Sequence, residues 1–192
     1  MSGGTQEPSA VDARADKLIE AHADRAYAIA LRMTGNEADA GDVVQEAFLR
    51  VIRYMKSYDD TYSFEAWLSQ IIRNVYLNSL RVEARKRAVP LSAAREGAEE
   101  DSLTLEDKLA DPAPGPERTA ESHEAVDEVQ NGLDALSPTL RMAVVLVDLE
   151  GVAREQAAQA LGCSMSALDV RLHRGRGALR EAIARTRAGG KA

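Results

Sequence analysis

Residues 157–172, AAQALGCSMSALDVRL, are the part of the sequence that most clearly indicates its fold. Small alanines come first, Gly162 follows them, and Leu168 and Leu172 then recur at helical spacing. The pattern is typical of a helix-turn-helix, in which small residues lie where two helices touch, glycine makes the turn and apolar anchors lie beneath the second helix. The second helix of such a unit enters the major groove of DNA. The alternative is a helical hairpin whose basic face is merely solvated.

Helical patterns also account for most of the remaining chain. Apolar residues recur every three or four positions from Leu18 to Met33, and Asn36 and Ser63 are suitable N-caps for two further helices. Nearer the C-terminus, Ser137-Pro138 combines an N-cap with a proline at the first helical position. Because the sequence contains no alternating strand pattern, we predict an all-α fold.

Composition divides the chain into two small helical domains. Its 192 residues are enough for both, and prolines, glycines and acidic residues crowd the middle. A segment of that kind cannot bury enough apolar surface to fold alone, so we predict a flexible acidic linker. The expected parts are a disordered extension over residues 1–14, a helical domain over 15–88, the linker over 89–122 and the helix-turn-helix domain over 123–187.

The net charge of −7 at first argues against nucleic-acid binding, which needs Lys and Arg on the contacting face. The distribution of charge argues the other way, because basic residues cluster at 81–87 and 171–187, on either side of the acidic linker. The third helix places amides and guanidinium groups on one stripe, which suits nucleic-acid contact. Its members are Asn74, Asn78, Arg81 and Arg85. The second helix instead carries an acidic face, whose simplest interpretation is a solvated surface.

Several classes of function find no support in the sequence. The single Cys163 cannot form an internal disulfide, and the three histidines are too far apart in sequence to suggest a metal site with it. No apolar run is long enough to cross a bilayer and none suits a secretory signal, so we expect a cytoplasmic protein without membrane insertion. No nucleophile-base pair, phosphate loop or metal constellation is visible, and we expect no catalytic residue, metal or cofactor.

Motifs in both halves resemble the extracytoplasmic-function (ECF) group of sigma factors, in the sigma-70 superfamily. In the C-terminal half they are LDALSP at Leu133–Pro138 and RLHRGRGALR at Arg171–Arg180. In the N-terminal half, DVVQEAFLRV at Asp42–Val51 looks like the family's polymerase-binding helix, while FEAWL at Phe64–Leu68 and IRN at Ile72–Asn74 look like its promoter-opening segment. Two motif sets in the right order make coincidence a poor explanation.

The resemblance implies a role for each surface of this sequence. The acidic face would bind core RNA polymerase at its clamp helices, through Asp39, Asp42, Gln45 and Glu46. The −10 promoter contacts would be Tyr58, Tyr62, Asn74, Asn78, Arg81 and Arg85. The −35 contacts would be Ser166, Asp169, Arg171, His173, Arg174 and Arg176. The two tyrosines could stack on an unpaired base or merely pack their loop, whereas Phe48 and Trp67 are expected in the core.

The implied function is promoter-specific initiation of transcription. The implied partners are core RNA polymerase, at its clamp helices and flap, promoter DNA, and an anti-sigma factor that holds the protein inactive. The linker would either serve as a solvated tether or thread through the positively charged polymerase channel. Two other functions stay open: a conventional DNA-binding regulator that works without polymerase, and a decoy that only sequesters an anti-sigma protein.

Four residues depart from the family's usual pattern. Asp169 occupies a position of the recognition helix that is usually basic or neutral, so it would repel phosphate unless it accepts a hydrogen bond from cytosine. Ala153 replaces the usual serine or threonine N-cap, at a cost of about 1 kcal/mol. Gly175 and Gly177 should each weaken the last helix by about 1 kcal/mol relative to alanine. We therefore expect a soft C-terminal domain that a partner could stabilise.

Overall fold

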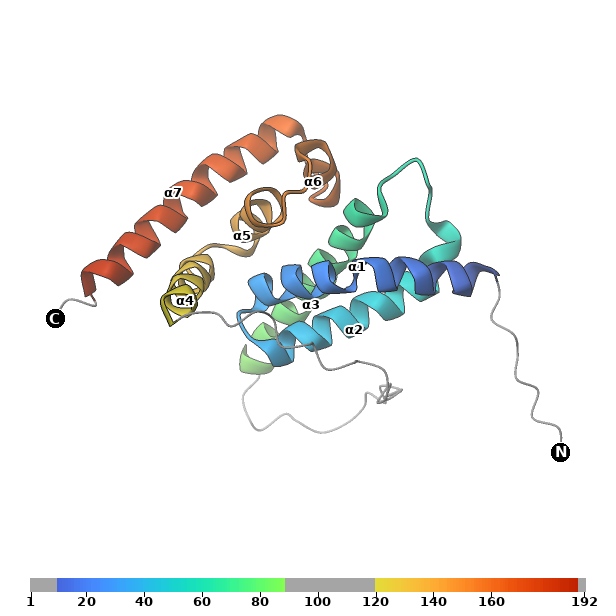
Figure 1. The fold of residues 1–192 in the computed structure, drawn as a ribbon, viewed down its shortest axis with the longest axis horizontal. Helices are drawn as coiled ribbons and strands as arrows, with labels where there is room; N and C mark the ends of the chain where they lie inside the picture. The colour runs from blue at the N-terminus through green and yellow to red at the C-terminus, as the bar shows by residue number, and fades with distance from the viewer. Residues whose placement is uncertain (1–9, 89–119, 190–192) are drawn as a thin grey trace.

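A computed structural model describes residues 10–88 and 120–189, and this part of the chain is helical with no strand (Figure 1). The N-terminal unit consists of α1 (Ala10–Thr34), α2 (Glu37–Tyr54), the short η1 (Met55–Ser57) and α3 (Phe64–Ala88). The C-terminal unit consists of α4 (Ala120–Asp134), α5 (Pro138–Val144), the π-helical turn η2 (Val145–Leu149), α6 (Arg154–Ala160) and α7 (Met165–Gly189). The predicted all-α fold with two helical units is confirmed.

Local capping explains where α2 and α3 begin. Asn36 accepts a 2.8 Å hydrogen bond from the backbone N–H of Asp39, and Ser63 Oγ accepts one of 3.4 Å from Ala66 N–H. Ser137 occupies the N-cap position of α5 with Pro138 next to it, but its side chain makes no capping hydrogen bond. Ala153 has no side chain that can cap α6, as the sequence predicted. The Asn36 and Ser63 caps satisfy backbone donors that every helix start leaves open.

Two helices begin a few residues outside the expected domain bounds. Residues 10–14 were assigned to a disordered extension, but they form the first turns of α1, where Val11 packs against the core and Ala15 is buried. Residues 120–122 were assigned to the linker, but α4 begins at Ala120. On α1, the apolar contact of Val11 extends the helix beyond the periodic pattern that marked it. The rest of the expected extension and linker, residues 1–9 and 89–119, lies outside the described residues.

The apolar stripes of the helices meet in one continuous core. Its largest fully buried side chains in the N-terminal unit are Ile29, Met33, Val51 and Ile72. Those in the C-terminal unit are Leu133, Met142, Val144, Val145, Leu146, Leu168 and Leu172. Phe48 and Trp67, both expected in the core, are half-buried and pack against it. Burial of these side chains supplies the main driving force for folding.

Gly175 has a role that the sequence did not reveal. A Cβ atom at this position would lie 2.7 Å from Val144 Cγ2 and 3.3 Å from the Leu140 carbonyl oxygen, so glycine lets α7 approach α5 closely. At Gly177 a Cβ would meet nothing within 4 Å. The expectation that both glycines soften α7 is therefore incomplete, because Gly175 also permits the packing of the C-terminal unit.

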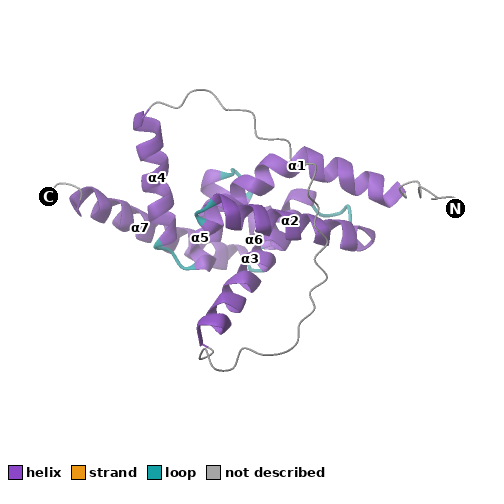
Figure 2. Cartoon of the chain, turned by 90° about the horizontal axis from the view of Figure 1, so that it is seen from below, coloured by secondary structure: helices purple, strands orange, loops and turns teal. Residues whose placement is uncertain are grey.

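The two units pack against each other. Helix α3 lies against α6, and α1 lies against α4, α5 and η2 (Figure 2). Four side chains cross this interface to main-chain carbonyls, each at or near the end of a helix. Arg141 reaches Met33 at 2.6 Å, Gln130 reaches Arg32 at 3.4 Å, Arg73 reaches Ala160 at 3.4 Å and Arg25 reaches Glu150. Helix C-termini leave carbonyls without partners and attract cations, which explains the chemistry of the contact.

Candidate nucleic-acid and protein interfaces

Helices α6 and α7 form the predicted helix-turn-helix. Ala157 and Ala158 are buried at the helix contact, and Leu168 and Leu172 are buried beneath α7. Gly162 lies in the turn with φ of +57°, a left-handed conformation that favours glycine. Ser164 then begins α7, since its Oγ accepts a 3.2 Å hydrogen bond from Ala167 N–H. The residues that suggested the motif thus make the contacts that define it.

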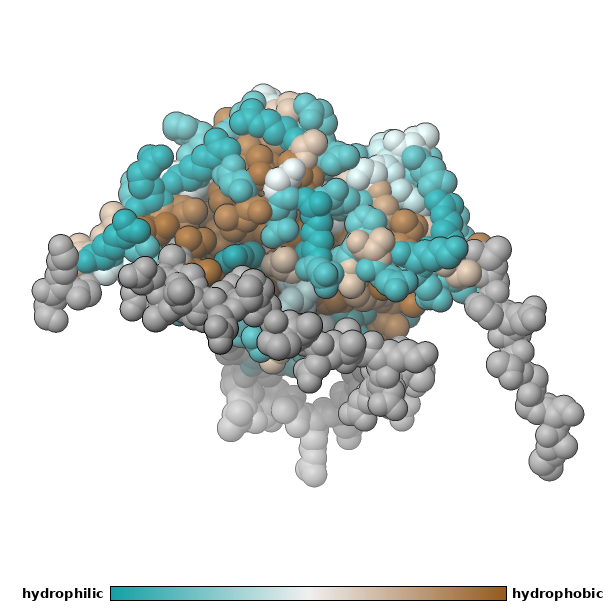
Figure 3. All heavy atoms as spheres, in the orientation of Figure 1, coloured by the Kyte–Doolittle hydropathy of each residue, from teal (hydrophilic) through white to brown (hydrophobic). Residues whose placement is uncertain are grey.

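The face of α7 opposite these anchors is open to solvent. Ser166, His173 and Arg174 are exposed there, and so is Val170, half of whose surface is accessible. Hydrophilic side chains cover the outer edge of α7 in the space-filling view (Figure 3). Three of the six predicted −35 contacts therefore lie on one accessible stripe of α7, and a major groove admits an α-helix.

One flank of α7 carries two ion pairs that the sequence did not predict. Asp169 accepts a 3.1 Å hydrogen bond from Arg154 Nη1 at the start of α6. Arg176 donates two bonds to Asp148 of η2, at 2.8 Å from Nε and 2.6 Å from Nη2. These bonds and the charge of Asp148 raise the pKa of the Arg176 guanidinium. Of the predicted contacts, Asp169 and Arg176 are thus already engaged within the protein.

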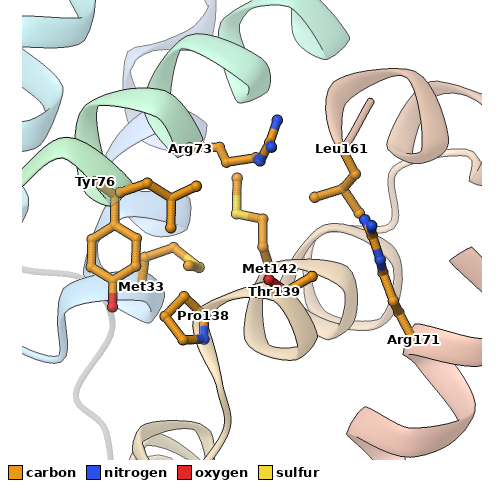
Figure 4. A pocket seen from close by; sticks show the side chains of 9 residues that line it. Met33, Arg73, Tyr76, Pro138, Thr139, Met142, Leu161 and Arg171 are labelled. Carbon is orange, nitrogen blue, oxygen red and sulfur yellow. The ribbon is translucent and has the colours of Figure 1, made fainter. Parts of the chain in front are cut away.

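The opposite flank of α7 faces the N-terminal unit. Arg171, another predicted −35 contact, is half-buried and lines a pocket between the units. Arg73 of α3 lines the same pocket, and Met33, Met142 and Leu161 supply part of its apolar wall (Figure 4). In this arrangement Arg171 is not on the open face of α7.

The predicted −10 residues of α3 share one exposed stripe, as their spacing indicated. Asn74, Asn78, Arg81 and Arg85 are all exposed, and neither arginine has an ion-pair partner among the described residues. The stripe begins near the contact with α6 and continues toward the end of α3. Its amides and guanidinium groups are available for hydrogen bonds to phosphates or base edges.

The two tyrosines of the loop before α3 have different environments. The Tyr58 ring lies 4.9 Å from that of Trp67 and meets Phe64 edge-on at 5.6 Å, and its hydroxyl donates a 2.6 Å bond to the Tyr62 carbonyl. Burial, and secondly the nearby Asp60, raise the pKa of Tyr58. The side chain of Arg14 covers the same ring. The geometry favours a packing role for Tyr58, while Tyr62 is 52% exposed.

The predicted acidic face of α2 is present, and its carboxylates differ in exposure and in their hydrogen-bond partners. Asp42 and Gln45 are exposed, and Asp42 has no ion-pair partner among the described residues. Asp39 also belongs to the helix cap, where its carboxylate accepts a 2.7 Å bond from Asn36 Nδ2. Glu46 is half-buried and accepts a 2.6 Å bond from Arg50. Asp42 and Gln45 are therefore the residues of this face most available to a partner.

Within the residues that the structure describes, no group of three or more His, Cys, Asp or Glu side chains could hold a metal ion. The same part of the chain contains no helix with the length and apolarity needed to cross a membrane.

Comparison with known proteins places the two units in one family. The chain matches Sigma-70 region 2 over residues 18–86 and Sigma-70 region 4 over residues 127–179. The ECF RNA polymerase sigma factor SigE of Mycolicibacterium smegmatis is 36% identical over 88% of this chain, which spans 62% of that relative. The RNA polymerase sigma factor CarQ of Myxococcus xanthus is 34% identical, with 88% of each protein covered.

Two solved structures share the fold. One is the sigma factor RpoE of Bartonella quintana in complex with the anti-sigma factor NepR, with a TM-score of 0.64 and 22% identity over 88% of this chain and 96% of that one. The other is CnrH in complex with the cytosolic domain of CnrY, with a TM-score of 0.57 and 22% identity over 90% and 88% of the two chains.

Proposed function

Because this chain belongs to the extracytoplasmic-function group of the sigma-70 family, we propose that it binds core RNA polymerase and directs it to particular promoters. The N-terminal unit, residues 15–88, engages the polymerase and opens the −10 element. The C-terminal unit, residues 123–187, reads the −35 element and contacts the flap. The protein supplies binding surfaces rather than catalytic groups, and it acts in the cytoplasm.

One observation carries this proposal: the two family regions occur in order, and each presents an exposed surface of the chemistry that its role needs. Helix α2 offers carboxylates to a basic protein surface, whereas α3 and α7 offer amides and guanidinium groups to DNA. A regulator that works without polymerase would give the acidic face of α2 no role.

On the polymerase side, the proposed contacts are Asp39, Asp42, Gln45 and Glu46, and Asp42 provides the cleanest test. Asp42→Lys reverses an exposed charge with no intramolecular partner among the described residues, so the fold should be unchanged. We expect Asp42→Lys to bind the core enzyme more weakly than the wild type does. The loss of affinity should be larger at low salt, where charge attraction is least screened. Glu20→Lys, a reversal of an exposed charge on α1, is the matched control and should leave core binding unchanged.

The packed arrangement of the two units must open on a promoter. The −10 and −35 elements are roughly 25 base pairs apart, or about 85 Å along B-DNA. Helices α3 and α6 touch in the structure, so their units cannot reach both elements at once. At ~3.3 Å per extended residue, the segment of residues 89–119 is long enough to bridge such a separation. Opening also releases Arg171 and Arg73 from the pocket between the units.

An anti-sigma factor is the proposed inhibitory partner. RpoE and CnrH, which share this fold, were solved with an anti-sigma factor and with the cytosolic domain of CnrY. Such a partner would act by covering the polymerase- and DNA-binding surfaces of this chain until a signal removes it.

Reconstituted transcription tests the whole proposal. Core polymerase and the purified chain are incubated with a library of promoter fragments, and the transcript ends are mapped. A sigma factor gives discrete start sites that depend on the added protein. Binding to duplex DNA without the core enzyme would instead indicate a conventional regulator. A chain that binds an anti-sigma protein but yields no start sites would be a decoy.

A further inference from the structure

The ion pair between Arg154 and Asp169 joins two helices at the end of the C-terminal unit that carries the helix-turn-helix. Arg154 is the first residue of α6 and Asp169 lies in the second turn of α7, and both side chains are about half exposed. Figure 1 shows α6 and the first turns of α7 side by side. Asp169 is three residues after Ser166 and four before His173, so it adjoins both on the helix surface. Arg154 is thereby held beside the open face of α7.

The first two turns of that open face contain no permanent cation of their own. Their exposed side chains are Met165, Ser166, Asp169 and Val170. Arg171 lies on the other flank, in the pocket between the units, and His173 and Arg174 of the open face come in the next turn. Helix-turn-helix proteins contact base edges mainly with the N-terminal residues of the second helix. The ion pair with Asp169 therefore brings a cation, Arg154 of α6, to that region.

The two ion pairs on this flank differ in how much of each guanidinium they occupy. Arg176 donates hydrogen bonds from both Nε and Nη2 to the Asp148 carboxylate, so both donors on that edge of its guanidinium are occupied. This pair links α7 to η2. Arg154 gives a single hydrogen bond, from Nη1 to Asp169 Oδ1. A guanidinium has five N–H donors, so most of those of Arg154 are free for a ligand. A fixed guanidinium with free donors is suited to bind guanine through O6 and N7.

We propose that Arg154 reads a guanine in the −35 duplex and that Asp169 is the residue that positions it. This inference rests on the proposed function and adds a specificity-determining residue to it. The carboxylate that would repel DNA if unpaired instead neutralises part of the charge of Arg154 and fixes its direction. Because Asp169 already orders the Arg154 side chain, Arg154 loses less conformational entropy when it binds DNA.

The test uses the holoenzyme, reconstituted from core polymerase and the full chain, and a promoter pool with a randomised −35 region. Bound fragments are sequenced, and affinities are then measured for the preferred sequence and for each single-base change. We expect the wild type to prefer guanine at one position. Arg154→Ala should reduce that preference about 10- to 100-fold and leave the other positions unchanged. Arg154→Lys keeps the positive charge but lacks the planar guanidinium that can donate two parallel hydrogen bonds. It should therefore lose the preference for guanine but retain general affinity for DNA.

Asp169 is tested by rescue. Asp169→Ala should weaken the preference for guanine at the same position, and Asp169→Glu should restore most of it, because the carboxylate can still bind Arg154. Arg185→Ala is the control, since this exposed arginine lies 16 residues beyond Asp169 on α7, about 24 Å away. It should not change the sequence preference. Thermal unfolding of each variant checks that the fold is intact.

Three results would overturn the inference. A uniform loss of affinity for all sequences in Arg154→Ala would make Arg154 a phosphate contact. An unchanged preference in Arg154→Ala together with a lost cytosine preference in Asp169→Ala would mean that Asp169 reads DNA directly. Tighter binding to every sequence in Asp169→Ala would make Asp169 only a repulsive charge. If the wild-type holoenzyme selects no −35 sequence at all, the proposed function fails instead.

Discussion

The guanidinium of Arg141 donates a 2.6 Å hydrogen bond to the main-chain carbonyl of Met33, which precedes it by 108 residues. This bond ties α5 of the C-terminal unit to the end of α1. Arg141 is only 7% exposed, and its other contact is an ion pair of 3.0 Å with Asp134. A buried arginine that completes the end of another helix joins the two units more specifically than apolar contact alone.

Removal of this side chain should loosen the contact between the units. Arg141→Ala leaves the Met33 carbonyl without its donor and removes a charge-assisted hydrogen bond, which lowers the free energy of unfolding by about 2 kcal/mol. Urea denaturation measures that loss, and small-angle X-ray scattering should show a larger radius of gyration. Arg174→Ala, at an exposed arginine, is the control. An Arg141→Ala protein of wild-type stability and size would refute this role.

The sequence was sufficient for features that depend on near neighbours. Asn36, Ser63 and Gly162 act within four residues of their own positions, so their cap and turn chemistry predicted the helix boundaries they mark. Exposure of the α3 stripe followed from helical spacing in the same way.

Features that depend on distant partners could not be predicted. Arg154 and Asp169 are 15 residues apart, and Asp148 and Arg176 are 28 apart. No spacing rule links such positions, because only the packing of α6 and η2 against α7 brings them together. The sequence therefore identified Asp169 and Arg176 as candidate DNA contacts without revealing that each already has a partner. Arg154 was not among the predicted DNA contacts, since an isolated arginine at a helix start carries no signal of such a role.

The two glycines of α7 should respond oppositely to alanine. Gly175→Ala places a methyl group 2.7 Å from Val144 Cγ2, and relief of that clash requires α5 and α7 to separate, at a cost of about 1–3 kcal/mol. Gly177→Ala meets nothing within 4 Å and gains helix propensity, so it should stabilise by up to about 1 kcal/mol. Differential scanning calorimetry of the two variants measures whether Tm falls for Gly175→Ala and rises for Gly177→Ala. Equal shifts in Tm would contradict the close approach at Gly175.

Glu150 should make stability depend on pH in the weakly acidic range. Burial is the main cause that raises the pKa of its carboxyl above 4.5; Arg25 and Arg32 lower it, and Glu65 raises it further. A raised pKa means that the folded state binds the proton more tightly than the unfolded state does, so Glu150 favours folding below pH 4.5 and that contribution is lost as pH rises through the raised pKa.

Glu150→Gln should accordingly be more stable than the wild type at pH 7. The difference should shrink as the pH falls toward 4.5, because the wild-type carboxyl then becomes neutral as well. Urea denaturation at several pH values measures this convergence. A difference that stays constant across the range would mean that the titration of Glu150 does not affect folding.

Tyr58 and Tyr62 should separate folding from promoter opening. Tyr58→Phe keeps the ring contacts with Trp67 and Phe64 but loses the 2.6 Å hydrogen bond to the Tyr62 carbonyl, so the protein should lose about 1 kcal/mol of stability.

Tyr62→Ala removes a ring that is 52% exposed, so stability should change little. If that ring stacks on an unpaired base, its loss should instead reduce opening of the −10 element. Permanganate reactivity of unpaired thymines in the holoenzyme complex measures opening, and thermal unfolding measures stability. Normal opening with Tyr62→Ala would exclude Tyr62 as the platform.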